Sequence, residues 1–175
     1  MADLLSIEIL FDARTEERVR SEWDALAALG VSSLAAHTER TNRPHATLIA
    51  GAPHDLVSEI DLPIRITLGA PVLFGDGDRR VLARSVIPST GVLELQKKVH
   101  GLAAGHPVDP HFTPGRWMPH VTLARRIRID DLPRALEFIG DEISGEAVAL
   151  RSWNPGSRTT RVIAGRDPHD AVSTQ

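Results

Sequence analysis

The sequence predicts an α+β protein in which two pseudo-symmetric lobes, with antiparallel sheets and flanking helices, surround a central cleft. Two matching five-residue stretches suggest the two halves: residues 44–48 (PHATL) and 119–123 (PHVTL) share proline, histidine, threonine and leucine in register. Strand-like segments are also joined by tight turns instead of regular crossovers, which favours antiparallel pairing. With 175 residues, we expect a single bilobal domain at residues 1–165 and a flexible C-terminal tail at 166–175.

The first half is expected to contain a strand, a helix and the first motif strand. Residues 4–11 are short and rich in branched apolar side chains, as in a strand. Asp12 is a plausible N-cap for a helix over 13–29, whose apolar residues recur at three- and four-residue spacing and place Trp23 in the core. The motif strand follows at 43–50, and a short helix is expected at 54–60.

The second half is expected to be built mainly from hairpins. Residues 63–74 alternate as a strand with a break at Gly69 to Pro71, and the turn at 75–78 leads into a returning strand at 80–87. Ser89 or Thr90 caps a helix that ends at Gly105. The remaining elements are an irregular loop at 106–118, the second motif strand at 119–126, a helix at 130–139, and a hairpin of 145–153 with 157–164.

Each motif places an imidazole beside a hydroxyl. Side chains alternate between the two faces of a strand, so His45 and Thr47 share one face, while Ala46 and Leu48 take the other. His120 and Thr122 repeat this arrangement. If the two strands meet across a cleft, two histidines and two hydroxyl donors surround one anion, which suits acid–base chemistry at a phosphate.

A third His-x-Thr sequence, at His111, is interpreted differently. Pro114 and Gly115 follow it at once and break a strand, so we expect His111 to lie on a loop. His106, Asp109 and His111 could bind a cation, which would make the protein a metal enzyme, but no paired-carboxylate or HExxH pattern accompanies them. We therefore expect no metal and no cofactor.

Composition and charge restrict the possible functions. The net charge of −3 argues against a general nucleic-acid coat, although arginines cluster near the second motif. The absence of cysteine excludes disulfides and thiol nucleophiles. The sequence begins without a basic region followed by an apolar run, and no segment is long and apolar enough to span a membrane, so we expect a cytoplasmic monomer without membrane association.

The two motifs resemble those of the two-histidine phosphoesterase superfamily, the 2′-5′ RNA ligase-like proteins. That family carries two His-x-[Thr/Ser] motifs, each followed by an apolar residue, and residues 116–119 (RWMP) also resemble family members. The resemblance implies a bilobal fold, catalysis without metal, and hydrolysis of a 2′,3′-cyclic phosphate on an RNA terminus or small cyclic nucleotide. It assigns His120 as base, His45 as acid, and Thr47 and Thr122 as donors to the phosphate.

Substrate contacts are expected beside the motifs, from Arg43, Arg116, Trp117, Arg126 and Phe112. In a regular strand, Arg126 and Arg128 would share the face of His120, while Arg125 would face away. With no tyrosine and few aromatic residues, base stacking would fall to Phe112, Trp117 or Trp153. Two alternatives stay open: 2′-5′ RNA ligase activity, and a non-catalytic module that binds a nucleotide or an RNA end.

Overall fold

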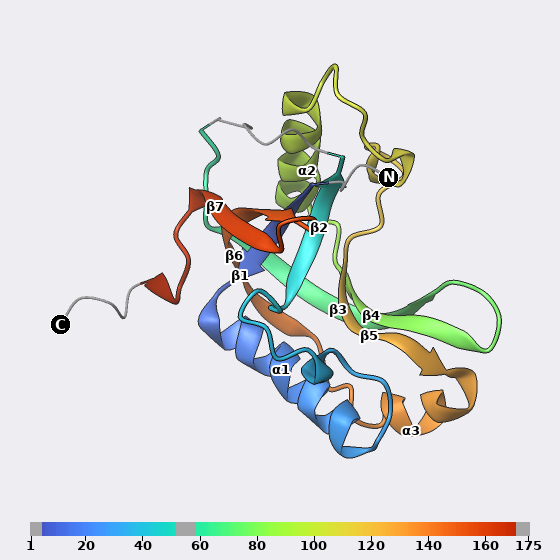
Figure 1. The fold of residues 1–175 in the computed structure, drawn as a ribbon. Coiled ribbons are helices and arrows are strands. Elements are labelled where there is room, and N and C mark those ends of the chain that lie inside the picture. The colour runs from blue at the N-terminus through green and yellow to red at the C-terminus, as the bar shows by residue number, and fades with distance from the viewer. Residues whose placement is uncertain (1–4, 52–58, 171–175) are drawn as a thin grey trace.

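The computed structural model describes residues 5–51 and 59–170. These residues form seven strands, three α-helices and three 3₁₀ helices (Figure 1). In order these are β1 (Ser6–Phe11), α1 (Ala13–Ala28), η1 (Leu34–Ala36), β2 (His45–Ala50), β3 (Ile64–Phe74), β4 (Arg79–Val86), α2 (Thr90–Leu102), η2 (Pro110–Phe112), β5 (His120–Arg128), η3 (Ile129–Asp131), α3 (Leu132–Leu136), β6 (Ile143–Asn154) and β7 (Thr159–Gly165).

The strands pair antiparallel into a single sheet with the order β2-β1-β6-β3-β4-β5, and β7 pairs with β6. The two motif strands, β2 and β5, occupy opposite ends of this order. Pairing of β3 with β6 joins a half that contains β2, β1 and β6 to a half that contains β3, β4 and β5. The predicted α+β class with antiparallel strands is confirmed, and the two halves share one continuous sheet.

The two long helices start at the predicted caps. The Asp12 side chain accepts a hydrogen bond from the backbone N–H of Thr15, and Ser89 accepts one from Val92. Helix α1 packs against β6 and β5, whereas α2 packs against β2 and β3. Each motif strand is therefore covered by a helix, and the apolar side chains between these layers form the core.

The sequence predictions of the hairpins hold well. The turn between β3 and β4 carries Gly75 and Gly77 at positive φ, and the register of β3 shifts between Leu68 and Pro71, where a break was expected. Helix α3 is shorter than predicted, because its first turn is the 3₁₀ helix η3. The helix expected at 54–60 falls almost wholly outside the described residues.

The predicted tail boundary at residue 165 is too early. Asp167 is buried and forms an ion pair with Arg43, and His169 contacts Glu16, so the chain is held against the domain beyond residue 165. Residues 171–175 lie outside the described part of the chain. Within that part, no helix combines the length and apolar character needed to cross a membrane.

Candidate active site

The two motif strands show the alternation that the sequence predicts. Ala46 and Leu48 are fully buried, while His45 and Thr47 are partly exposed. Val121 and Leu123 are likewise buried, and His120 and Thr122 are partly exposed. Each strand therefore presents one imidazole and one hydroxyl on its accessible face, anchored by apolar neighbours on the other.

Both histidines are oriented in the same way. Nδ1 of His45 lies 2.6 Å from the carbonyl oxygen of Arg43, and Nδ1 of His120 lies 2.8 Å from that of Met118. A carbonyl oxygen can only accept, so Nδ1 carries the proton in each ring. In both motifs the acceptor is two residues upstream, across a proline, which leaves Nε2 free for chemistry.

The motif strands meet although they stand at opposite ends of the sheet order. Strands β2 and β5 are in contact, and two indole N–H groups bond to their backbones. The Trp117 indole donates to the carbonyl of Thr47 at 2.9 Å, and the Trp23 indole donates to that of Thr122 at 3.0 Å. Tryptophans thus satisfy edge-strand carbonyls at both motifs and fix the two strands in place.

The two histidines have different surroundings. The Phe74 ring lies against His120, with 4.5 Å between the ring centroids. Burial lowers the pKa of His120 below its ordinary value; its hydrogen bond to Met118 opposes this, and the positive charge of His45 adds to it. His45 instead faces a carboxylate, because its Nε2 lies 3.6 Å from Oε1 of Glu8.

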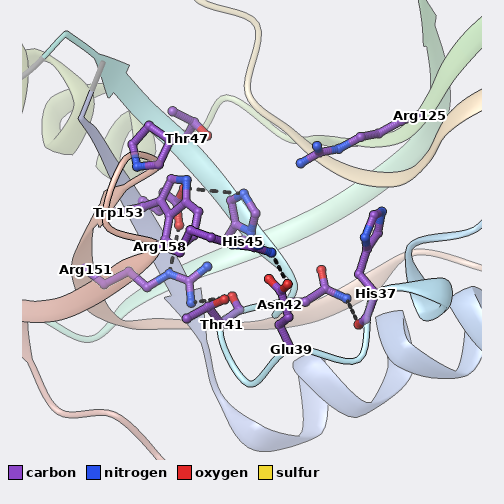
Figure 2. A pocket seen from close by; sticks show the side chains of 12 residues that line it. His37, Glu39, Thr41, Asn42, His45, Thr47, Arg125, Arg151, Trp153 and Arg158 are labelled. Atoms are coloured by element: carbon purple, nitrogen blue, oxygen red, sulfur yellow. Dashed lines mark hydrogen bonds and ion pairs between the residues drawn. The ribbon is translucent and has the colours of Figure 1, made fainter. Parts of the chain in front are cut away.

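A pocket of about 460 Å³ opens beside His45 and Thr47. Figure 2 shows its walls: Arg151 and Trp153 lie on one side, and Arg125 projects toward the pocket from β5. Arg158 from the β6–β7 turn reaches Glu39 and forms an ion pair with it. The pocket therefore combines an indole and the Arg125 guanidinium next to a motif histidine, while Arg151 and Arg158 pair with Glu8 and Glu39 in its wall.

The expected facing of Arg125 in β5 is wrong. The register between β4 and β5 shifts twice, between Arg80 and Leu82 and between Leu82 and Ala83. Each shift inserts an extra residue in β5, so the alternation inverts at Ala124 and Arg125 and is restored at Ile127, which is buried. As a result Arg125 lines the pocket, whereas Arg126 is exposed, as in a regular strand, and does not line the pocket.

The other residues predicted to contact the substrate lie in different parts of the structure. The Arg43 guanidinium is buried and pairs with Glu16 and Asp167, so it serves the structure and is not available to a ligand. Phe112 and Trp117 pack partly buried against the core. Arg116 is exposed on the loop before β5.

Sequence reasoning missed several residues that surround the pocket. Glu8 and Arg151 face each other across β1 and β6, and both are almost fully buried. A glutamate between isoleucines in a short apolar strand was an available signal, because buried charges are rare unless they are paired. The loop of residues 37–42 also contributes to the pocket, although its sequence gives no such indication.

The three residues of the possible metal cluster do not come together. Asp109 and His111 do contact each other, with 2.9 Å between Oδ1 and Nδ1, on the exposed turn η2. His106 does not join them, and among residues 5–51 and 59–170 no group of three histidine, aspartate or glutamate side chains could hold a metal ion. Metal independence stays a prediction that needs a chelation experiment.

Comparison with known proteins identifies a fold. No protein-family model matches the sequence, and no curated protein matches it significantly. Among solved structures, Usb1 of Kluyveromyces marxianus is similar, with a TM-score of 0.53 and 9% identity over 92% of this chain and 97% of that one. Usb1 of the same species with uridine monophosphate gives a TM-score of 0.48, with 10% identity and the same coverage. The chain therefore shares the fold of Usb1 along nearly its whole length.

Proposed function

We propose that this protein is a metal-independent phosphodiesterase that hydrolyses a 2′,3′-cyclic phosphate to a 2′-phosphate. The observation that carries the proposal is the pair of motif histidines, both held through Nδ1, which leaves Nε2 as the nitrogen that can transfer a proton. The resemblance of the two motifs to two-histidine phosphoesterases supports it, and so does a fold that is shared with Usb1.

The reaction needs one base and one acid on opposite sides of the phosphorus. His120 accepts a proton from the attacking water through Nε2, and the oxygen of that water forms a bond to phosphorus. The bond between phosphorus and O3′ breaks, and His45 donates its Nε2 proton to that oxygen, so the phosphate stays on O2′. Thr47 and Thr122 donate hydrogen bonds to the non-bridging oxygens.

The environments of the two histidines favour this division of roles. A base must be neutral when the substrate arrives, and the burial that lowers the pKa of His120 keeps it so. An acid must donate a proton, and His45 is the motif histidine with a carboxylate, Glu8, 3.6 Å from its Nε2. The reverse assignment would place the proton on His120, whose burial lowers its pKa.

The hydroxyl groups of Thr47 and Thr122 fit the role of phosphate donors. Both side chains are partly exposed on the accessible face of their strands. In the described part of the chain, neither hydroxyl hydrogen-bonds to a protein group, so each can donate to a ligand. This donor pair, one from each motif, matches the two non-bridging oxygens of a phosphodiester.

The pocket beside His45 supports a nucleotide as the substrate. Trp153 offers a face on which a base can stack, and Arg125 offers a guanidinium for a further phosphate. We therefore expect a cyclic phosphate on an RNA terminus or a nucleotide. A non-catalytic binding module would use the same pocket without turnover.

Product analysis tests the proposal. Purified protein is incubated with nucleoside 2′,3′-cyclic phosphates and with RNA oligomers that end in one, and the products are identified by ³¹P NMR. We expect a 2′-monophosphate from at least one substrate. Adding an RNA with a free 5′-hydroxyl reveals a ligase as a 2′-5′ joint. Binding of the oligomers without hydrolysis would contradict the proposal and favour the binding module.

A further inference from the structure

Glu8 occupies an unusual position for a carboxylate. It lies in the centre of β1 and is 3% exposed, with isoleucine on either side in the sequence. Cross-strand pairing sets it opposite Thr47 on β2 and opposite Arg151 on β6. Because directly paired residues share a face of the sheet, Glu8 shares the accessible face of β2 with Thr47. Buried carboxylates are rare unless they are paired, so the position of Glu8 needs an explanation.

Two neighbours orient the carboxylate. The Ser6 hydroxyl donates to Oε1 at 2.9 Å, and the Arg151 Nε–H donates to Oε2 at 2.8 Å. Arg151 is itself held, because it donates to the carbonyl of Thr41 at 3.0 Å. The oxygen that Arg151 leaves free, Oε1, is the one that lies 3.6 Å from Nε2 of His45.

The charges of this group influence each other. Burial by itself raises the pKa of Glu8, but the positive charges of His45 and Arg151 hold it below its usual value. Among the described residues, no carboxylate forms an ion pair with His120, which lies against the Phe74 ring instead. Two motifs that match in sequence therefore differ in what faces their histidines.

Other titratable and charged groups lie around His45. From β6, Arg151 is committed to Glu8; from β5, Arg125 brings positive charge to the same pocket, and His120 contributes a ring whose pKa is lowered. From the loop before β2, Glu39 pairs with Arg158, and His37 lines the same pocket. Glu8 is thus the carboxylate with a direct contact to His45 among the described residues.

We propose that Glu8 is a positioning residue that holds the Nε2 proton on His45 and thereby commits His45 to the role of acid. The inference rests on the proposed function for its meaning in catalysis. The proposal gives the two similar motifs different tasks. His45, next to Glu8, acts on the side of the phosphorus where O3′ leaves, and His120 acts on the side where water attacks.

The pH profile of the rate tests the contact. Glu8→Gln keeps the shape and the Ser6 contact but removes the charge, so the alkaline limb of the rate against pH should move to lower pH. Glu8→Asp keeps the charge and should restore part of that limb. Glu22→Gln is the matched control, because Glu22 is a buried carboxylate that pairs with Arg84 instead of a histidine, and it should leave the limb in place.

Coupling between two titrating groups is reciprocal, which gives a second measurement that does not need Glu8→Gln to fold. In His45→Ala, the ¹³C midpoint of the Glu8 carboxyl should rise. An alkaline limb that stays in place in folded Glu8→Gln, or a Glu8 midpoint that does not change in His45→Ala, overturns the inference. The carboxyl titration needs no turnover, so a Glu8 midpoint that rises in His45→Ala, in a protein that hydrolyses no cyclic phosphate, would uphold the contact and refute the proposed function.

Discussion

Replacing Phe74 should change the pH at which the enzyme gains activity. The ring covers His120 at 4.5 Å, and burial is the largest cause that lowers the pKa of this histidine. In Phe74→Ala, water reaches the imidazole, and its pKa should return toward the ordinary value of 6.5. Since His120 must be neutral to act as base, the acidic limb of kcat/KM should move up to that pH.

The size of the effect follows from the titration. With a limb at about 6.5, the variant should reach about one-tenth of its plateau at roughly pH 5.5, whereas the parent keeps a larger fraction of its own. Phe74 is only partly buried, so its loss should cost about 1–2 kcal/mol of folding free energy.

The assay is initial-rate hydrolysis of a cyclic nucleotide across the acidic range. Leu73→Ala, which removes an exposed side chain from the same strand, is the control and should leave the limb in place. An acidic limb that stays fixed in Phe74→Ala, or that moves to lower pH, would refute the assignment of His120 as the base.

Three further results are expected. Trp153→Ala and Arg125→Ala should each raise KM for a cyclic-ended RNA by about tenfold, because each removes about 1–3 kcal/mol of stacking or charge-assisted contact. Arg126→Ala should leave KM unchanged. Equal effects of the two arginine variants would contradict the facing that the bulge in β5 gives to Arg125. Dialysis against a strong chelator should leave the rate unchanged, and restoration of a lost rate by Mn²⁺ or Zn²⁺ would favour a metal enzyme. Arg43 holds the pKa values of Glu16 and Asp167 low despite their burial. The stabilisation of the folded state by these ion pairs is therefore present above about pH 4.5 and is lost as the pH falls through the pKa values of the two carboxyls in the folded protein. Arg43→Met should lower the free energy of unfolding in urea by about 3–5 kcal/mol at neutral pH and make it depend less on pH in the acid range.

Local patterns in the sequence predicted much of the fold. Alternation placed His45 and Thr47 on one face, and the caps at Asp12 and Ser89 marked the starts of the long helices. These features depend on neighbours within a few residues, so a single sequence contains them. Trp23 was also correctly placed in the core, although its hydrogen bond to Thr122 was not foreseen.

Features that depend on distant pairing were not predictable in the same way. Glu8 contacts Arg151 only because β1 pairs with β6, and Arg43 forms an ion pair with Asp167, which lies near the other end of the chain. Arg125 lines the pocket because β5 contains extra residues relative to β4, and no local residue pattern in β5 predicts this bulge. The sequence thus located the motif histidines, while the tertiary structure determined which charges surround them.

Turnover by single and double histidine variants tests the acid–base pair most directly. His45→Ala and His120→Ala should each lower kcat on a 2′,3′-cyclic phosphate by ~10²–10⁴-fold, and the double variant should lose little beyond the worse single one, because the two rings act as a unit. Circular dichroism confirms that each variant is folded. A single variant that keeps near-parental turnover on every cyclic phosphate that the parent hydrolyses would contradict two-histidine catalysis.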